Sequence, residues 1–399
     1  MNIWILNHYA ISPNSVGGTR HFDLAYELVK KGHTVRIFAS SFNHLERVET
    51  IKYDRKKFKE ESIDKVQFTW IKTPPYKTSS KRLVNISVFA LRLNRVLNQY
   101  LKHETPDLII GSSVHPLTPL VGIRKAKKAK VLFYFEERDL WPQTFIDFGI
   151  LSERNIVSKV LFKIEKYLYT HSDKVIFLFE NAHNYAYAHG LSPSKSIHIP
   201  NGYNTKRVNS SVTYDNIDEM LEKYKNKKIC IYTGSMGEAN HMFPLLELAE
   251  SMKFHQEYHF LFVGSGNLKT SLIEFAKRNE ITNISFHNPV PKEQIPYLLS
   301  KSHCGLLSMK DSPLYNWGFS MNKIYDYLSI GLPTYIYTGL ESLGELEKSE
   351  AVFYSNEVEV LRKGIITGLD VERKDIKDFA YNNYSWDILA NRLLKEIDK

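Results

Sequence analysis

Short apolar runs alternate with longer amphipathic stretches along most of the chain. The first unit has an apolar run at Ile3–Leu6, a glycine-rich loop, an amphipathic stretch from Phe22 to Lys31 and a second apolar run at Thr34–Phe38. This order predicts a strand, a helix and a parallel strand, which is the repeat of a doubly wound sheet. Further runs of strand length follow at 108–110, 131–135, 174–179 and 196–199.

The same alternation begins again after Pro200-Asn201-Gly202. These three residues favour a turn, because proline restricts φ while asparagine and glycine tolerate positive φ. Runs of strand length then follow at 228–232, 258–263, 284–286, 304–307 and 333–336. The pattern therefore predicts an α/β protein with two Rossmann-like domains, a hinge at the turn and a cleft between the domains.

The composition narrows the class of protein. With 399 residues, 43% hydrophobic and 24% charged, the chain has the proportions of a globular protein of two domains and not of a disordered or fibrous one. No run reaches the roughly 18 apolar residues of a membrane-spanning helix, and the first residues lack a signal-peptide pattern, so we expect neither spanning nor secretion. Cys230 and Cys304 lie in apolar runs, which favours core positions.

The net charge of +9 is unevenly divided. Residues 1–205 hold 30 Lys and Arg against 18 Asp and Glu, whereas residues 206–399 hold 23 against 26. A basic first half suggests an anionic partner for that half, such as acidic lipid or a phosphorylated ligand, although a well-solvated surface has the same composition. The basic residues are not interleaved with aromatic ones as in a nucleic-acid platform, so nucleic acid is the least favoured partner.

One segment of the first half, Lys77–Lys102, begins with basic residues and continues as an amphipathic helix with an apolar stripe from Leu83 to Leu97. Such a stripe either packs on its own domain or inserts near anionic headgroups, and the pattern leaves both open. A second basic run at 124–130 is either a solvated helix end or an added electrostatic attraction to a membrane.

Two glycine-containing loops each follow a predicted strand and precede a helix. Gly17 and Gly18 form the first loop, and Gly234 and Ser235 stand in the second. Such loops let the backbone approach a ligand closely, and the free N–H groups at a helix start favour anions. Both loops therefore suit phosphate groups, although a tight strand-to-helix turn explains them equally well.

The densest cluster of candidate residues lies in the segment 320–333. Lys323 and Asp326 are three residues apart on a predicted helix, so both can face one side. The lysine suits phosphate oxygens, and the carboxylate can accept hydrogen bonds from ribose hydroxyls. Ser320 or Asn322 is expected to cap the start of this helix.

These motifs resemble those of bacterial retaining glycosyltransferases of family 4 with the GT-B fold, and the likeness runs over almost the whole chain. The matching segments are Gly17-Gly18, Lys31–Val35, Ile199–Gly202, Asn322–Pro333 and Tyr384-Ser385-Trp386. The segment 136–143, Glu-Glu-Arg-Asp-Leu-Trp-Pro-Gln, is similar to a signature of enzymes that add N-acetylfucosamine-type sugars in O-antigen and capsule assembly.

The resemblance implies an acceptor-side domain at 1–204, a nucleotide-sugar domain at 205–380 and a final helix within 381–399 that crosses back to the first domain. It also implies transfer from a nucleotide diphosphate sugar, with UDP favoured, and retention of anomeric configuration. Lys323 would neutralise the leaving diphosphate and Asp326 would hold the ribose. Backbone contacts would come from Gly18, Gly234 and Ser235.

The resemblance further assigns candidates to the acceptor side. His115 matches the histidine that reaches the donor sugar or the acceptor, and Arg138 and Asp139 are expected to orient the acceptor hydroxyl or its loop. No covalent nucleophile is assigned.

Two departures from the family pattern concern the donor. An acidic residue common eight positions before Asp326 is replaced by Gly318, and the usual Arg and Lys after the first strand of the second domain are missing. We expect Lys323 to carry most of the phosphate charge and Gly318 to reflect a deoxy-amino sugar with fewer hydroxyls. No Asp-x-Asp pair occurs in the chain, so no metal cofactor is expected.

The sequence thus favours a transferase that extends a polyprenyl-diphosphate-linked saccharide at the cytoplasmic face of the membrane, with the basic first domain meeting acidic lipid. The alternative enzyme is a GT-B-fold nucleotide-sugar epimerase, which would need neither an acceptor nor a membrane.

Overall fold

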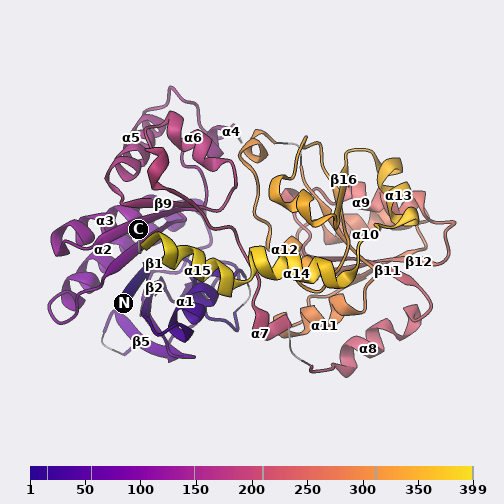
Figure 1. Cartoon of the computed structure of the whole chain (residues 1–399), viewed down its shortest axis with the longest axis horizontal. Helices are drawn as coiled ribbons and strands as arrows, with labels where there is room; N and C mark the ends of the chain where they lie inside the picture. The colour runs from indigo at the N-terminus through magenta and orange to yellow at the C-terminus, as the bar shows by residue number, and fades with distance from the viewer. Residues whose placement is uncertain (16, 55, 148, 209–210, 311, 398–399) are drawn as a thin grey trace. The chain divides into compact units, whose positions relative to one another are not determined.

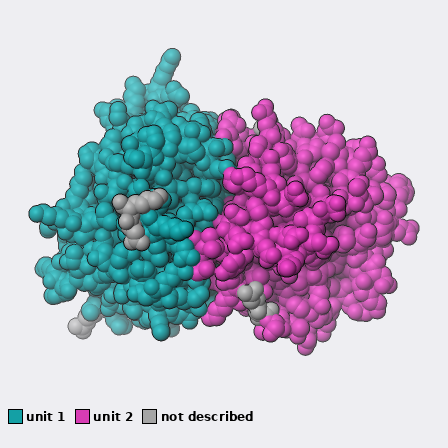
Figure 2. All heavy atoms as spheres, in the orientation of Figure 1, with its two compact units in different colours: residues 1–201, 317–320, 389–399 teal, residues 202–316, 321–388 magenta. Residues whose placement is uncertain are grey.

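The computed structural model describes residues 1–15, 17–54, 56–147, 149–208, 211–310 and 312–397. The chain divides into two compact units, which Figure 2 distinguishes by colour. Unit 1 comprises residues 1–201, 317–320 and 389–399, and unit 2 comprises residues 202–316 and 321–388.

The division differs in two ways from the domains expected from the sequence. The chain leaves unit 1 after Asn201, three residues before the expected boundary, and the short segment Trp317–Ser320 belongs to unit 1. The last helix, α15 (Trp386–Ile397), begins at the expected tryptophan, and its residues from Leu389 onward belong to unit 1. Asp398 and Lys399, the end of the expected segment 381–399, lie outside the described residues.

Unit 1 contains, among the residues described, an eight-stranded sheet in the order β10-β9-β8-β7-β1-β2-β6-β5 (Figure 1). All neighbouring strands run parallel except β5, which is antiparallel to β6. The strands are β1 (Asn2–Leu6), β2 (Thr34–Ser40), β5 (Phe58–Ile63), β6 (Val66–Ile71), β7 (Leu108–Ser113), β8 (Leu132–Glu137), β9 (Lys174–Phe177) and β10 (Ser196–His198), with β3 (Phe42–Asn43) and β4 (Val48–Glu49) in a separate antiparallel pair. The helices are α1 (Arg20–Lys30), α2 (Ser79–Tyr100), α3 (Leu117–Ala129), α4 (Gln143–Asp147), α5 (Ile156–His171) and α6 (Ala182–Ala188).

The β5–β6 hairpin was absent from the expected elements. β6 pairs with β2 as a further parallel strand, and β5 closes that edge as an antiparallel one. The four central residues of β5, Lys59 to Ser62, are polar and exposed, so this edge strand lacks an apolar run. Such a strand forms because it pairs with a neighbouring strand, so the period of apolar residues in the sequence does not reveal it.

The apolar stripe of α2 belongs to the core of unit 1. Phe89, Leu93 and Leu97 are fully buried against Trp4, Leu6 and their neighbours from the sheet. Leu83, at the start of the stripe, is 66% exposed. Most of the 83–97 stripe therefore packs on its own domain, which favours the first of the two alternatives that the sequence left open.

Unit 2 contains a parallel sheet whose described strands have the order β13-β12-β11-β14-β15-β16. The strands are β11 (Lys228–Ser235), β12 (Tyr258–Ser265), β13 (Ile284–His287), β14 (Cys304–Ser308), β15 (Thr334–Tyr337) and β16 (Val352–Ser355). The helices are α7 (Thr205–Val208), α8 (Asp215–Leu221), α9 (Phe243–Ser251), α10 (Lys269–Arg278), α11 (Ile295–Ser300), α12 (Asn322–Ser329), α13 (Val358–Thr367) and α14 (Arg373–Tyr384), and α15 begins here.

The two cysteines confirm the expectation that they are core residues. Cys230 on β11 and Cys304 on β14 are register partners on adjacent strands, and both are buried free thiols.

Each sheet has a point at which the strand order reverses. In unit 1 this point lies between β1 and β7, and in unit 2 it lies between β11 and β14. Loops leaving the carboxyl ends of two such strands diverge to opposite faces, which opens a crevice where ligands of α/β proteins bind. The residues that follow these four strands are therefore the first candidates for a site. Among the described residues, no helix is both long and apolar enough to cross a membrane.

Candidate active site

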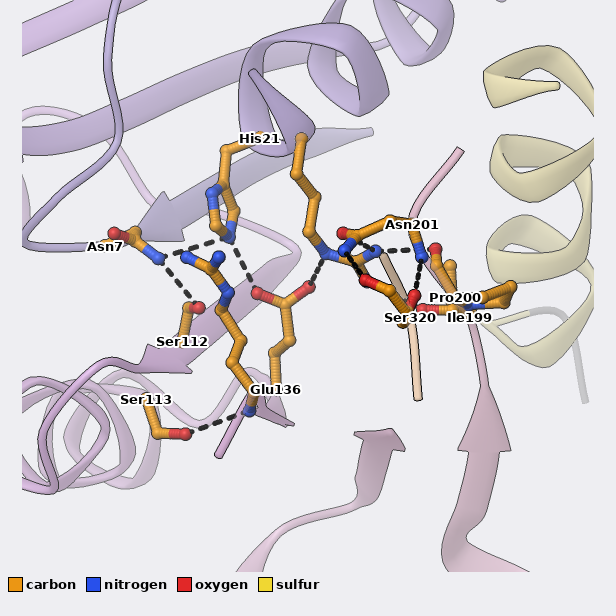
Figure 3. Close-up of polar contacts among 11 residues, drawn as sticks. Asn7, His21, Ser112, Ser113, Glu136, Ile199, Pro200, Asn201 and Ser320 are labelled. Atoms are coloured by element: carbon orange, nitrogen blue, oxygen red, sulfur yellow. Dashed lines mark hydrogen bonds and ion pairs between the residues drawn. The ribbon is translucent and has the colours of Figure 1, made fainter. Parts of the chain in front are cut away.

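The switch point of unit 1 holds a cluster of buried polar side chains. Asn7 and His8 follow β1, whereas Ser112 and Ser113 end β7 and His115 comes two residues later. The Asn7 amide donates to the Ser112 hydroxyl at 2.8 Å and tethers the two strand ends (Figure 3). Because both strands end at the same edge of the sheet, residues about a hundred positions apart share one site.

His8 and His115 form a buried pair. His8 Nδ1 lies 2.8 Å from His115 Nε2, and the His8 ring stacks on Phe89 with 4.1 Å between the ring centroids. Burial, together with the smaller effect of the nearby Arg82 charge, lowers the pKa of His115 to about 3. Burial likewise holds the pKa of His8 well below its usual value, so both rings are neutral at pH 7. A neutral pair of this kind can share one N–H between the rings and cannot supply a positive charge to an anionic ligand.

An ion pair joins the start of α1 to the end of β8. Arg20 Nε donates to Glu136 Oε1 at 2.8 Å, and His21 Nε2 lies 2.7 Å from Glu136 Oε2 (Figure 3). Burial by itself would raise the pKa of Glu136, but the Arg20 guanidinium and His21 hold that pKa well below its usual range. The carboxylate is therefore charged and accepts hydrogen bonds on both oxygens.

The same arginine binds the segment through which the chain leaves unit 1. Its two terminal nitrogens donate to the carbonyl oxygens of Ile199 and Pro200 at 2.9 and 2.6 Å. Asn201, the next residue, donates through its backbone N–H and its side-chain amide to Ser320, each at 2.7 Å (Figure 3). Arg20 thus links α1, β8 and the interdomain motif within one buried network.

Arg138 and Asp139 follow β8 directly. The Arg138 backbone N–H donates to the Ser113 hydroxyl at 3.1 Å, which holds this residue beside the end of β7. Arg138 Nε is buried and has no hydrogen-bond partner among the described residues. Desolvation raises the pKa of Asp139, against the opposing effect of the nearby Arg138 and Arg82 charges. Of the candidates in unit 1, Arg138 and Asp139 therefore interact with each other at the end of β8, and His115 follows the neighbouring strand β7, with Arg82 near both His115 and Asp139.

Adjacent carboxylates at the end of β8 face opposite sides of the sheet. Glu136 faces α1, whereas Glu137 accepts a hydrogen bond from the Tyr169 hydroxyl of α5 at 2.6 Å. Burial raises the pKa of Glu137 to about 8, against the opposing effect of the Tyr169 hydrogen bond. This alternation follows from the two-residue period of a strand. The two carboxyl groups therefore have different protonation at pH 7.

The switch point of unit 2 brings Lys323 against the first glycine loop of that unit. Lys323 Nζ donates to Asn240 Oδ1 at 2.8 Å and lies 5.0 Å from the centroid of the Tyr232 ring. Gly234 has a φ of +128°, and a Cβ built on it would lie 2.4 Å from Lys323 Cε. Glycine at 234 is therefore required for the lysine to lie against the end of β11.

Burial lowers the pKa of Lys323 to about 8. The lysine is thus still largely charged at pH 7, in a partly desolvated position where an anion would interact strongly with it. Gly234 and Ser235 are the last residues of β11, and Asp326 lies one helical turn after Lys323. The geometry places the lysine, the glycine and Asn240 in contact.

The expected cap of α12 is wrong. Asn322 is the first residue of the helix, and the capping position is Met321, whose side chain cannot accept a hydrogen bond. Ser320 instead accepts from the backbone N–H of Asn201. The hydroxyl that suits a helix cap serves a contact within unit 1, because tertiary partners compete with local ones.

Gly318 has a conformational reason to be glycine. Its φ is +92°, and a Cβ at this position would lie 3.1 Å from the backbone nitrogen of Glu180. An acidic residue here would be strained whatever the substrate. The expectation that Gly318 reflects the donor sugar therefore competes with a reason that lies in the backbone.

Gly17 and Gly18 occupy the loop between β1 and α1, and the helix begins two residues later at Arg20.

Sequence patterns included Glu136 only as part of a motif and did not single out Arg20, His21, His8 or Asn240. Their one sequence signal is position: His8 lies just after β1, Arg20 and His21 begin α1, and Asn240 lies in the short 3-10 helix Glu238–Asn240 that follows β11. In the part of the chain that is described, no group of three or more His, Cys, Asp or Glu side chains could hold a metal ion.

Two family models match the chain in sequence. The model described as Glycosyltransferase Family 4 matches residues 17–207, and the model described as Glycosyl transferases group 1 matches residues 213–386. A curated relative from Escherichia coli (strain K12), named as a colanic acid biosynthesis glycosyl transferase, WcaI, is 24% identical over 289 residues. The alignment covers 71% of this chain and 70% of that relative.

Solved structures resemble the chain over its full length. Sucrose-phosphate synthase from Thermosynechococcus elongatus has a TM-score of 0.70 at 14% identity, and the alignment covers 100% of this chain and 98% of the synthase chain. HepE from Anabaena, solved in complex with UDP-glucose, has a TM-score of 0.66 at 13% identity, with 100% and 99% covered. At such identities the likeness establishes the fold, which is GT-B.

Proposed function

We propose that this chain transfers a sugar from a UDP-sugar to a lipid-linked saccharide with retention of configuration. The premise is that the chain belongs to the GT-B glycosyltransferases in which a family 4 part is joined to a group 1 part. The pathway proposed is the assembly of a bacterial capsule or O-antigen. The relative named for colanic acid biosynthesis supports a role in an extracellular polysaccharide, and HepE, solved with UDP-glucose, supports the nucleotide.

The observation that carries the proposal is the contact of Lys323 with Gly234 and Asn240 at the switch point of unit 2. Breaking the anomeric C–O bond builds negative charge on the departing diphosphate, and a fixed cation at that place stabilises the transition state. Asp326 and Asn322 follow on the same helix and are proposed to hold the ribose and a phosphate oxygen. Ser235, at the end of β11, supplies a further backbone contact.

Calorimetric titration of UDP and GDP into the wild type and Lys323→Ala tests the donor assignment. We expect micromolar UDP binding that weakens tenfold or more in the variant, which corresponds to about 1.4 kcal/mol. Lys225→Ala, at an exposed lysine of the same unit, is the matched control and should bind UDP as the wild type does. UDP binding that is indifferent to Lys323, or a preference for GDP, would remove the donor assignment.

The acceptor side is proposed to lie in unit 1. His115 and Arg138 stand at the ends of β7 and β8, and Arg138 Nε is buried without a partner in the described structure. A neutral His115 can donate or accept a hydrogen bond to a sugar hydroxyl, and Arg138 can complete its hydrogen bonds with an acceptor oxygen. Asp139 is proposed to orient the loop that adjoins it after β8. Product formation by Arg138→Lys, which keeps the charge but loses the forked geometry, should fall at least tenfold at unchanged UDP affinity.

The donor sugar is proposed to be an N-acetylated amino-deoxyhexose such as N-acetylfucosamine. The support is the segment Glu136–Gln143, whose first residues build the buried network of unit 1. Turnover of a UDP-acetamido-deoxyhexose should exceed that of UDP-glucose by at least tenfold in the presence of a lipid-linked acceptor. Equal turnover of both donors would contradict this choice.

Peripheral membrane binding is proposed for a surface at the start of α5. Ile150, Ile156, Val157 and Val160 are between 50% and 77% exposed. Lys159 and Lys163 are exposed among them. Helices of a βα unit start at the carboxyl edge of the sheet, so this apolar and basic surface lies at the same edge as the candidate site. It is suited to inserting a few apolar side chains among anionic headgroups.

The basic run at 124–130 lies at the other edge, because α3 ends there after starting at the switch point. Co-sedimentation with vesicles of anionic lipid should therefore fall in Ile156→Ser/Val160→Ser and stay unchanged in Lys127→Ser/Lys128→Ser. Binding that depends only on the second pair would place the membrane surface elsewhere.

Metal independence is also proposed. The positive charge at the diphosphate comes from Lys323 in this scheme, so transfer should continue at the same rate in the presence of a chelator. Loss of transfer that magnesium or manganese restores would contradict it. The epimerase alternative is disfavoured, because both matching family models describe transferases.

A further inference from the structure

A cavity of about 280 Å³ lies in unit 1 at the carboxyl edge of β1 and β2, on the side of β1 away from β7. Its walls come from the loop after β1, the end of β2, the β3–β4 pair and the β5–β6 hairpin. This volume is at the lower limit of the about 300–1,000 Å³ typical of ligand pockets. The lining residues are Ala10, Ile11, Ser12, Asn14, Ser15, Ser40, Ser41, Asn43, Thr50, Ile51, Glu61, Ile63 and Trp70.

The chemistry of this lining is that of a site for a neutral molecule with many hydroxyl groups. Five lining residues carry hydroxyls, two carry amides and one, Glu61, carries a carboxylate. Neither lysine nor arginine occurs among the described lining residues, although the first half of the chain is strongly basic. A phosphate or a carboxylate would meet Glu61, and no lining residue that the structure describes carries a positive charge to offset the repulsion.

One buried hydroxyl of the wall, that of Ser41, lies beside the Tyr53 hydroxyl. Ser41 is 1% exposed, and across the described structure its hydroxyl makes no aligned hydrogen bond. An interaction with Ser41 lowers the pKa of Tyr53 against the larger effect of burial, so the two hydroxyls satisfy each other in part, without a well-aligned hydrogen bond. A buried hydroxyl without a well-aligned hydrogen bond forfeits part of its hydrogen-bond energy, and a ligand hydroxyl that reaches Ser41 would restore it.

Glu61 is held ready to accept hydrogen bonds. The Trp70 indole N–H donates to Glu61 Oε2 at 2.7 Å, and the Trp70 ring stacks on Phe68 with 4.5 Å between centroids. This packing fixes the indole and, through it, one oxygen of the carboxylate. A carboxylate fixed in this way is a strong acceptor for sugar hydroxyls.

The cavity adjoins the candidate site through the backbone. The Ser40 N–H donates to the His8 carbonyl at 3.0 Å, so the wall at the end of β2 is bonded to the residue that pairs with His115. A Cβ at Gly17 would meet the side chains of Ile11 and Leu45, which places the glycine loop against the same segment.

We infer that this cavity binds one uncharged pyranose ring of the acceptor saccharide, a ring that carries neither the reacting hydroxyl nor the diphosphate. The inference rests on the proposed transferase function for the identity of the saccharide as acceptor. The cavity itself selects a neutral polyhydroxyl ring through Ser41 and Glu61.

Saturation-transfer NMR with methyl glycosides of glucose, galactose, mannose, fucose and N-acetylglucosamine tests the inference. At least one glycoside should bind in the millimolar range, and glucose 1-phosphate should bind at least fivefold more weakly than methyl glucoside. Ser41→Ala and Glu61→Gln should each weaken the best glycoside at least fivefold. Both changes are small, and the amide oxygen introduced by Glu61→Gln can still accept from the Trp70 indole.

Glu60→Gln is the matched control. Glu60 is the preceding residue of the same hairpin, but its carboxylate contacts Arg36 on the other face of the sheet. Glycoside binding should be unchanged in Glu60→Gln and in Lys323→Ala. If no glycoside binds, if binding survives both pocket variants or if the sugar phosphate binds best, the inference is wrong.

The two proposals fail separately. If UDP binds through Lys323 but no glycoside binds, the transferase proposal stands and the sugar cavity does not. If glycosides bind through Ser41 while UDP does not bind, the cavity is a sugar site but its occupant is not a transferase acceptor, which also overturns the inference as stated.

Discussion

Arg20 and Glu136 form an ion pair at 2.8 Å, and their side chains are only 3% and 2% exposed. The pair joins residues 116 positions apart and is completed by His21 and by the carbonyls of residues 199 and 200. Because both side chains are almost fully buried, solvent can do little to compensate for a lost partner.

Removal of one member should therefore be costly. Arg20→Met leaves the Glu136 charge buried beside His21, and the expected loss is about 3–5 kcal/mol in the free energy of unfolding. Urea unfolding followed by circular dichroism measures it. The double variant Arg20→Met/Glu136→Leu should recover part of the loss. Lys348→Ala, at an exposed pair with Glu345, should leave stability within error, and an equal effect at both pairs would contradict this account.

His115 should make the protein sensitive to mild acid. The folded pKa of about 3 lies below the unfolded value near 6.5, so below pH 6.5 the unfolded chain binds a proton that the folded chain excludes. Stability present above pH 6.5 is then lost as pH falls toward 3, by about 2 kcal/mol at pH 5 from this group. His115→Gln should lose less stability between pH 7 and 5. The exposed His103 is the control, and parallel pH profiles of wild type and His115→Gln would exclude the assignment.

Glu165 should have the opposite effect of pH. Burial raises its pKa well above the usual value, the nearby Glu137 raises it further, and Tyr185 donates to it at 3.0 Å. The folded chain therefore keeps a proton that the unfolded chain releases above pH 4.3, and stability falls as pH rises from there. Glu165→Gln imitates the protonated acid and should raise Tm by about 2–4 °C or more at pH 8, with little change at pH 5. Glu274→Gln, at an exposed carboxylate, should show no such difference, and a lower Tm of Glu165→Gln at pH 8 would be the contrary result.

UDP binding should take up a proton at Lys323. Without a ligand the pKa of Lys323 is about 8, so this lysine is mostly neutral at pH 8.5. A bound diphosphate would favour its charged form. Calorimetry at pH 8.5 in two buffers of different ionisation enthalpy should report an uptake of about half a proton or more. Affinity should fall as pH rises from 7 to 9.5. Lys323→Met should show neither effect, and identical proton uptake in both proteins would refute the contact.

Gly318 should tolerate no side chain. Its φ of +92° and the closeness of the Glu180 nitrogen predict that Gly318→Ala costs about 1–3 kcal/mol in unfolding free energy. Gly318→Glu, which restores the acid common in the family, should be at least as destabilised and should not gain turnover of UDP-glucose. A stable Gly318→Glu with raised UDP-glucose turnover would favour the donor-sugar explanation over the backbone one. Gly339→Ala is the control, since a Cβ there meets no atom.

The candidate site could be predicted only in part from the sequence. Lys323 and Gly234 were found because a glycine loop after a strand and a helix of known register are local patterns. His8 and His115 are 107 positions apart, and Arg20 and Glu136 are 116 apart. No local period records such pairs, because they depend on which strands become neighbours in the sheet.

By itself the sequence determined the α/β class, the two-part division near Asn201, the glycosyltransferase family and most of the parallel strands, since apolar period and turn residues are local properties. Only the tertiary structure decided that the stripe of α2 faces the core, that the polar β5 joins the sheet and that Ser320 binds Asn201 and caps no helix. The physical reason is that burial and hydrogen bonding are settled by partners brought from far along the chain, and the same amphipathic or polar segment fits more than one set of partners until packing selects one.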